Sequence, residues 1–252
     1  MTASASRRRN AAAPPGRAKP ARRKAAAKPA GTSSPRYARA RRDRGADTRA
    51  QLIMAALDAF GRVGYEGAST REIAKAAGAN LAAIVYHFGG KEALHLAVAE
   101  YIVTRINGLV GPALAAMATP DAVASPKAAR AALGRVIGAM ADVMLGNAEA
   151  ERWARFIVRE QMQPTAAFDL IYGFMGGSHG LATKLVATAM GRPEDEDVKM
   201  RVFTIMGQVL IFRVAQTLVL RRLGWKTIGA AEREKIKRII VANINAILDH
   251  EP

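Results

Sequence analysis

Residues 69–88, STREIAKAAGANLAAIVYHF, contain two short apolar runs on either side of Gly78. Ser69 with Glu72 three residues later has the pattern of a capping box, which predicts that a short helix starts here. Asn80 has the side chain of a cap for a second helix, which would run to the end of this stretch. Gly78 suits a left-handed turn between the two helices, because glycine carries no Cβ. Two short helices joined by a tight turn predict a helix-turn-helix unit.

A further amphipathic helix is predicted before this unit. Asp47 and Thr48 have side chains typical of an N-cap, and Gly64 is a suitable C-terminal stop. Between them, apolar residues at positions i, i+3, i+4 and i+7 form one face of a helix. These residues are Ile53, Ala56, Leu57 and Phe60. The three helices together predict a compact N-terminal domain over residues 47–92.

Several polar side chains of this domain have the chemistry of a DNA reader. Arg71 lies in the first turn of its helix, where its guanidinium can form a bidentate contact with guanine. Ser69 and Thr70 bring hydroxyl and N–H groups to a helix N-terminus, where a phosphate is favoured. Tyr86 and His87 end the second helix with donors suited to phosphate oxygens. Each of these features alone more often serves to cap a helix or to pack in a core than to contact DNA. Their combined spacing favours DNA binding.

The segment from Thr48 to Leu94 resembles the DNA-binding domain of the TetR family of bacterial transcriptional regulators. It includes ALDAFGRVGYEGASTREIAKAAGANLAAIVYHFGGKEAL, from Ala56 onward. In that family the second helix of the motif enters the major groove, and a lysine of the fourth helix contacts the backbone. The resemblance therefore implies DNA contacts by Ser69, Thr70, Arg71, Asn80, Leu81, Ala82, Val85, Tyr86, His87 and Lys91.

The expected recognition helix departs from many family members. Leu81 and Ala82 stand where polar residues or proline are common, and Val85 stands where tyrosine is common. These side chains can pack on thymine methyl groups but cannot donate hydrogen bonds to base edges. We therefore expect Arg71 and sequence-dependent DNA shape to carry much of the base discrimination.

Residues 1–46 form a basic arm whose composition differs from the rest of the chain. They hold 14 Lys or Arg residues against the single acid Asp43, a net charge of +13 out of +17 for the whole chain. Their five prolines and their scarcity of large apolar residues predict disorder. Three roles stay open: a solvated extension, a non-specific clamp on DNA phosphates, or a transit peptide.

Residues 93–252 are predicted to be entirely helical, because no segment shows sustained alternation of polar and apolar residues. The expected fold is therefore all-α, with an N-terminal three-helix helix-turn-helix DNA-binding domain and a C-terminal helical domain for ligand binding and dimerisation. Ser125 and Pro126 have the pattern of an N-cap followed by a first-turn proline, after a break at residues 111–126. The helices are expected at about 91–110, from 126 onward, 148–163, 165–190, 194–223 and 228–248.

The last two predicted helices suit a homodimer interface. Both carry more apolar residues than one buried face requires, namely Val202, Ile205, Met206, Val209, Leu210, Phe212 and Val214, followed by Ile236, Ile239, Ile240, Ile244 and Leu248. A helix that is apolar nearly all round is usually buried. One side can pack on its own domain and the other on a second copy, and the alternative is that one chain buries both sides. Helix-turn-helix readers of symmetric half-sites about 34 Å apart work as dimers, which favours the first reading.

The C-terminal half carries a second resemblance. Residues 152–228, with RWARFIVREQMQPTAAFDLIYGFM and GQVLIFRVAQTLVLRRLGW, resemble the C-terminal domain of the CecR-like branch of TetR regulators. The resemblance implies a repressor of transport or drug-response genes.

Aromatic and thioether side chains recur over the central helices and predict an adaptable apolar pocket, with ordinary core packing as the alternative. The candidate ligand-binding residues are Met140, Met144, Trp153, Phe156, Phe168, Tyr172, Met175, Phe203, Met206 and Arg213. Arg213 interrupts an apolar run and needs a partner if buried, which can be a ligand, a second copy or Glu160. His179 and Gln208 are similar polar interruptions.

Other classes of protein are disfavoured by what the sequence lacks. It has no cysteine, no P-loop, HExxH or GxSxG motif, and no metal-ligand spacing among its four histidines, so we expect no enzyme, metal or cofactor. No run approaches the roughly 18 to 20 apolar residues of a membrane-spanning helix. We expect a cytoplasmic, nucleoid-associated repressor that binds palindromic double-stranded operator DNA as a homodimer and is released by a small apolar effector. The alternative is a non-specific basic DNA-binding protein without effector control.

Overall fold

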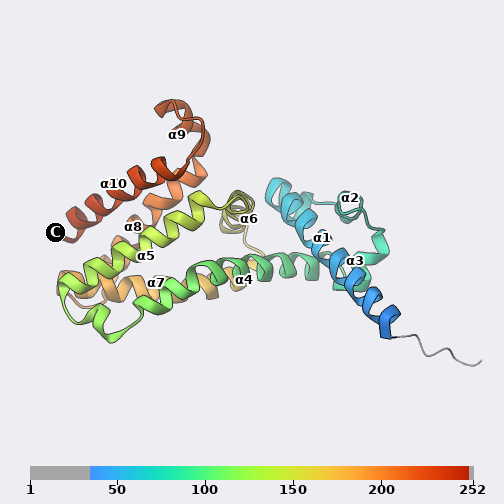
Figure 1. Ribbon diagram of the computed structural model, residues 1–252, viewed down its shortest axis with the longest axis horizontal. Helices are drawn as coiled ribbons and strands as arrows, with labels where there is room; N and C mark the ends of the chain where they lie inside the picture. The colour runs from blue at the N-terminus through green and yellow to red at the C-terminus, as the bar shows by residue number, and fades with distance from the viewer. Residues whose placement is uncertain (1–34, 250–252) are drawn as a thin grey trace, which may run out of the picture. The chain divides into compact units, whose positions relative to one another are not determined.

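The computed structural model describes residues 35–249, with side chains from residue 45 onward, and this part of the chain is helical without any strand. The expected all-α fold is therefore confirmed. The elements are α1 (Pro35–Gly67), α2 (Thr70–Ala76), α3 (Leu81–Phe88), α4 (Lys91–Met117), the 3-10 turn η1 (Pro120–Val123), α5 (Pro126–Gly146), α6 (Ala150–Met162), α7 (Ala166–Met190), α8 (Glu196–Val214), α9 (Gln216–Leu223) and α10 (Ala230–Asp249) (Figure 1).

The first helix starts earlier than expected. Because α1 begins at Pro35, Asp47 and Thr48 lie inside it, and the N-cap predicted at these residues is wrong. Proline is well tolerated in the first turn of a helix, and no proline follows within α1 to interrupt it. The basic arm predicted over residues 1–46 is thus helical from residue 35, and residues 1–34 lie outside the described part of the chain.

The turn of the helix-turn-helix unit forms as the sequence predicts. Gly78 has a φ of 63°, in the left-handed region, and the side chain of Asn80 accepts a hydrogen bond of 2.9 Å from the N–H of Ala83. Gly64, with a φ of 77°, interrupts the helical backbone inside α1, where a stop was expected. Ser69 holds the N-cap position of α2, but its side chain makes no capping hydrogen bond, so the predicted capping box does not form.

The N-terminal domain of residues 47–92, called the reading unit below, shares one hydrophobic core with the rest of the chain. Phe60 of α1 and Ile84 of α3 are buried in the same cluster as Ile102 of α4. Trp153 and Phe156 of α6 belong to this cluster as well. The boundary predicted at residue 92 therefore falls in the first turn of α4, which runs without a break from the reading unit into the body of the protein (Figure 1).

Two helix ends in the body differ from the prediction. The helix expected to stop near residue 110 continues through Pro112 to Met117, because Val110 and Met117 extend its buried stripe and tertiary packing holds the segment helical. The single helix expected at 194–223 is divided at Ala215 into α8 and α9, which are bent by 76°. Arg213 ties this bend to α5, since its Nε donates to the carbonyl of Met144.

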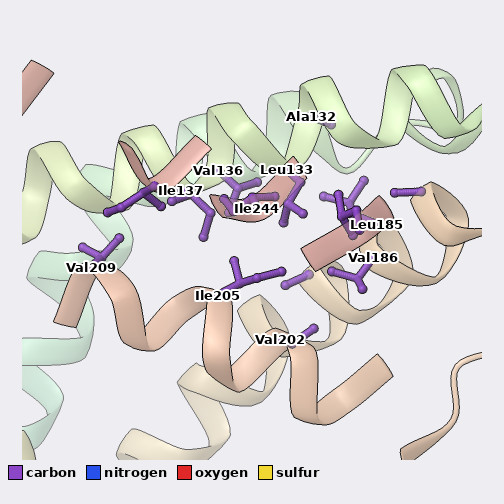
Figure 2. Close-up of a cluster of buried hydrophobic side chains, with 14 of the residues drawn as sticks. Ala132, Leu133, Val136, Ile137, Leu185, Val186, Val202, Ile205, Val209 and Ile244 are labelled. Carbon is purple, nitrogen blue, oxygen red and sulfur yellow. The ribbon is translucent and has the colours of Figure 1, made fainter. Parts of the chain in front are cut away.

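A second core holds the C-terminal helices together. Most of its side chains come from α5, α7, α8 and α10, and Figure 2 shows them interleaved between these helices. The labelled residues are Ala132, Leu133, Val136, Ile137, Leu185, Val186, Val202, Ile205, Val209 and Ile244. Within residues 35–249 no single helix is long and apolar enough to cross a membrane. The bent pair α8 and α9 has the length and composition of a membrane span only when the two helices are counted together.

Candidate DNA interface and effector cavity

Helix α3 turns an apolar face outward. Ile84 is buried against the core, whereas Val85 and Tyr86 are 62% and 78% exposed. Leu81 and Ala82 are exposed on the same short helix. Exposed apolar side chains gathered on one helix indicate a contact surface rather than a solvated one.

The polar candidates differ in their exposure. Arg71 and Asn80 are exposed, while Ser69, Thr70 and His87 are half-buried. The ring of His87 packs edge-on against that of Tyr86, with centroids 4.9 Å apart.

Lys91 is already held by the protein. Its Nζ donates to the carbonyl of Glu66 at 3.3 Å and lies 4.6 Å from the ring centroid of Tyr65. Arg49 of α1 is exposed and lies over the Phe88 ring at the end of α3, at 5.1 Å from its centroid. Sequence reasoning missed Arg49, because its position beside α3 depends on how the helices pack. The unit therefore offers a second cation near the exposed face of α3.

An apolar cavity of about 250 Å³ lies between α4, α5, α6, α7 and α8. Five of the predicted ligand residues line it, namely Met140, Met144, Met175, Phe203 and Met206. The other five do not. Trp153 and Phe156 are fully buried in the core shared with the reading unit, Phe168 is half-buried at the start of α7, Tyr172 is 67% exposed, and Arg213 faces a different groove. These residues contribute to the core or the surface because of the side of the helix on which they lie.

Sequence reasoning missed most of the cavity wall. On α7 the lining residues Ile171, Phe174, Met175 and Ser178 follow helical spacing, and on α4 Ile102, Ile106 and Val110 do the same. This periodicity is visible in the sequence, but it does not distinguish a cavity wall from a solid core.

Polar groups reach the cavity at three points: Gln161, Ser178 and His179. Nδ1 of His179 lies 2.9 Å from the carbonyl of Met175 and must donate to it, so in the neutral ring Nε2 is the acceptor. The hydroxyl of Ser178 donates to the same carbonyl at 2.9 Å. An apolar ligand that carries one hydroxyl or N–H donor fits this lining.

A buried polar cluster centred on His95 of α4 joins the reading unit to the body. Its ring lies against Phe60 and Tyr65 of α1 and against Phe156 of α6, with centroids 4.5, 5.0 and 5.0 Å away. Nε2 lies 3.2 Å from Oε1 of Glu160 without the geometry of a hydrogen bond.

The carboxylate of Glu160 has its own partners. Its Oε2 accepts from the hydroxyl and the N–H of Thr165 at 2.8 and 3.2 Å. Glu160 is therefore not the partner of Arg213, so that possible pairing is wrong. Phe156 and Glu160 each precede a cavity residue, Ile157 and Gln161, so α6 contacts both the cavity and the cluster.

Acid is expected to destabilise the fold through His95. Burial, reinforced by the positive charge of Lys91, lowers the pKa of His95 from 6.5 to about 4. Because the unfolded chain takes up this proton more readily, stability should fall between pH 6.5 and 4, by up to about 3 kcal/mol from this group. Urea unfolding at a series of pH values should show a steeper loss for the native protein than for His95→Phe. Parallel curves would contradict the prediction.

Two segments match known families. Residues 52–98 match the family described as bacterial regulatory proteins, tetR family, and residues 129–250 match the C-terminal domain of the HTH-type transcriptional dual regulator CecR. The CecR protein of Shigella flexneri is 35% identical over 211 residues, which cover 81% of this chain and 93% of CecR. The HTH-type transcriptional repressor AcnR of Corynebacterium efficiens is 38% identical over 74 residues, which cover 27% of this chain and 39% of AcnR.

Solved structures share the fold at low sequence identity. A TetR-like transcriptional regulator from Rhodococcus sp. RHA1 superposes with a TM-score of 0.60 at 16% identity, over 81% of this chain and 97% of that one. AibR, solved in complex with isovaleryl coenzyme A and operator DNA, gives a TM-score of 0.57 at 17% identity, over 79% of this chain and 97% of AibR. The chain therefore belongs to the TetR family of bacterial regulatory proteins, carries a CecR-type C-terminal domain, and is a DNA-binding transcriptional regulator rather than an enzyme.

Proposed function

We propose that this protein is a repressor that binds a palindromic operator as a homodimer and leaves it when a small apolar effector enters the cavity. The observation that carries the proposal is the placement of α6, which lines the cavity with Ile157 and Gln161 and contacts the reading unit through Phe156. Two names agree with this role, since AcnR is a repressor and AibR was solved with both a ligand and operator DNA, whereas CecR is named a dual regulator.

The expected mechanism is a shift between two conformers. An effector that binds more tightly to the cavity of one conformer increases the population of that conformer. Helices α4 and α6 connect the cavity to the reading unit, so a change in their positions moves that unit. A tenfold loss of operator affinity needs only about 1.4 kcal/mol of differential binding. Two reading units that are wrongly spaced can no longer contact both half-sites.

Arg71→Ala is expected to weaken operator binding by about tenfold or more, because a bidentate contact with guanine contributes about 1–3 kcal/mol of discrimination. The operator is first selected from a random duplex pool, and affinities are then measured by fluorescence anisotropy at fixed salt. Arg221→Ala on α9, also an exposed arginine, is the matched control. Equal affinity of Arg71→Ala and the native protein would refute this role. If the native protein shows no preference among DNA sequences and its DNA affinity only falls steeply with salt, the non-specific alternative is favoured.

Filling the cavity is expected to abolish the response to an apolar ligand. Val143 lines the cavity from α5, and Val143→Phe adds a ring to a space of about 250 Å³. The uncharged fluorophore N-phenyl-1-naphthylamine serves as the probe. The native protein should bind the probe, which enhances the fluorescence of the probe. Its affinity for operator DNA should then be lower than its affinity without the probe. The variant should do neither, and a variant that responds like the native protein would place the ligand elsewhere.

A further inference from the structure

An open groove of about 590 Å³ lies on the side of the molecule where α6, α9 and the end of α8 meet Gly61 of α1. Its walls combine three arginines with apolar side chains, and it shares no lining residue with the apolar cavity. The residues that matter here are Arg155, Arg159, Arg213, Val158, Val214 and Leu220.

Arg213 is a buried cation without a counter-charge. Arg213 is only 8% exposed. Its guanidinium donates to neutral groups: Nε to the carbonyl of Met144 at 2.6 Å, and Nη1 to Oε1 of Gln216 at 2.7 Å. Within the described residues no carboxylate lies within 4.0 Å of it. Burial lowers its pKa, and the charge of Glu151 offsets this only in part. A buried guanidinium without a counter-ion is costly, so an anion in the groove would be strongly favoured.

The other charged residues of the groove carry a net positive charge as well. Arg159 donates Nη2 to the carbonyl of Arg62 at 2.9 Å, which satisfies one donor but none of its charge. Arg155 is paired with the exposed Glu151 at 3.5 Å, and Glu151 is the acid that lines the groove. Three guanidinium groups therefore face one carboxylate. The planar fork of arginine matches the oxygens of a carboxylate or a phosphate.

The groove also touches the reading unit. Gly61 of α1 packs so closely on α6 that a Cβ there would lie 3.4 Å from the Cβ of Arg155 and 3.5 Å from the backbone nitrogen of Phe156. A molecule in the groove would therefore lie at the junction of α1 and α6. Val158, Val214 and Leu220 give the same groove an apolar wall.

We propose that this groove is a second ligand site, separate from the apolar cavity, that binds a small amphipathic anion with a carboxylate or phosphate head and a short apolar tail. The head group pairs with Arg213 and Arg159, and the tail lies on the apolar wall. Binding itself is independent of the proposed repressor function, whereas any effect on operator affinity rests on it.

The test uses the full-length protein and calorimetric titration with octanoate and octyl phosphate, which differ in the anionic head and by one carbon in the alkyl chain. Octanol and octyltrimethylammonium carry the octyl chain without the negative charge. We expect at least one of the anions to bind at least tenfold more tightly than both controls, and Arg213→Met and Arg159→Met each to weaken that binding by at least tenfold. Arg221→Met, an exposed arginine of α9 outside the groove, should bind like the native protein. Which anion binds more tightly identifies the head group.

Several results would overturn the proposal. Equal binding of octanoate, octyl phosphate and octanol would show that charge is not recognised. Displacement of N-phenyl-1-naphthylamine by the anion would place it in the apolar cavity instead. Arg159→Met keeps the test valid if Arg213→Met fails to fold, since Arg159 is not part of the buried core. An Arg213→Met protein that becomes monomeric while it binds the anion normally would show that a second copy supplies the counter-charge.

Discussion

The Ile211→Glu variant is expected to be monomeric and to lose operator affinity by at least about a hundredfold. The reason is multivalency: once one reading unit of a dimer is bound, the second meets its half-site at a high effective concentration, and this gain of about 10²–10⁴ disappears in a monomer. Each reading unit alone retains the same base contacts, so sequence preference should survive at the lower affinity.

The structure supports this position because one side of α8 exposes several apolar residues. Exposed residues recur on it every three or four positions, and they are Met200, Phe203, Gly207, Ile211 and Val214. Ile211 is 54% exposed, and Ile239 on the neighbouring α10 is 58% exposed. The side chains of Gln208 and Asn243 join α8 to α10 by a hydrogen bond of 2.9 Å. A second copy packed on this surface would bury an apolar area that a soluble monomer rarely exposes.

Sedimentation equilibrium and fluorescence anisotropy measure the two expected effects. Ile211 itself lines neither the apolar cavity nor the arginine groove, although Phe203, Gly207 and Val214 of the same side each line one of them. Leu109→Glu introduces the same charge at an exposed apolar residue of α4 and is the control. A dimeric Ile211→Glu protein with native operator affinity would disprove the proposed interface.

Phe156→Ala is expected to destabilise the fold by about 3–5 kcal/mol, the usual cost of removing a fully buried phenylalanine. Phe156 is 1% exposed and lies in the core shared by the reading unit and the body, next to His95. Its loss therefore leaves a cavity at the point where α6 contacts the reading unit. We also expect a weaker link between effector binding and operator release, because the packed contact between α6 and α4 is the proposed route between them.

Chemical denaturation provides the measurement. Phe168→Ala is the matched control, since Phe168 was an equally good ligand candidate by sequence but is only half-buried and should cost clearly less. Similar losses for the two variants would contradict the different roles that the structure assigns to these two aromatic residues.

Local patterns in the sequence predicted the DNA-reading unit well. The left-handed glycine at position 78, the cap at Asn80 and the bounds of α3 all depend on a few neighbouring residues, and the structure reproduces them. The capping box at Ser69 failed because a residue pattern permits a side-chain hydrogen bond without requiring it. The expected contacts of the reading unit with DNA remain predictions.

Hydrophobic periodicity and helix caps thus identified most helices of the body and most of their ends, since both patterns are local to one helix. They missed the division of α8 from α9 at Ala215 and the continuation of α4 to Met117. The same patterns could not separate Met144, on the cavity wall, from Trp153, in the core, because that difference depends on which helices face each other. The partners of Arg213 and Glu160 were equally hidden. Met144 and His95 are distant in the chain, and the bend after α8 and the turn after α6 bring Gln216 and Thr165 back to these side chains. Packing between helices therefore determined the positions of the apolar cavity, of the buried Arg213 and of the contact between α6 and the reading unit.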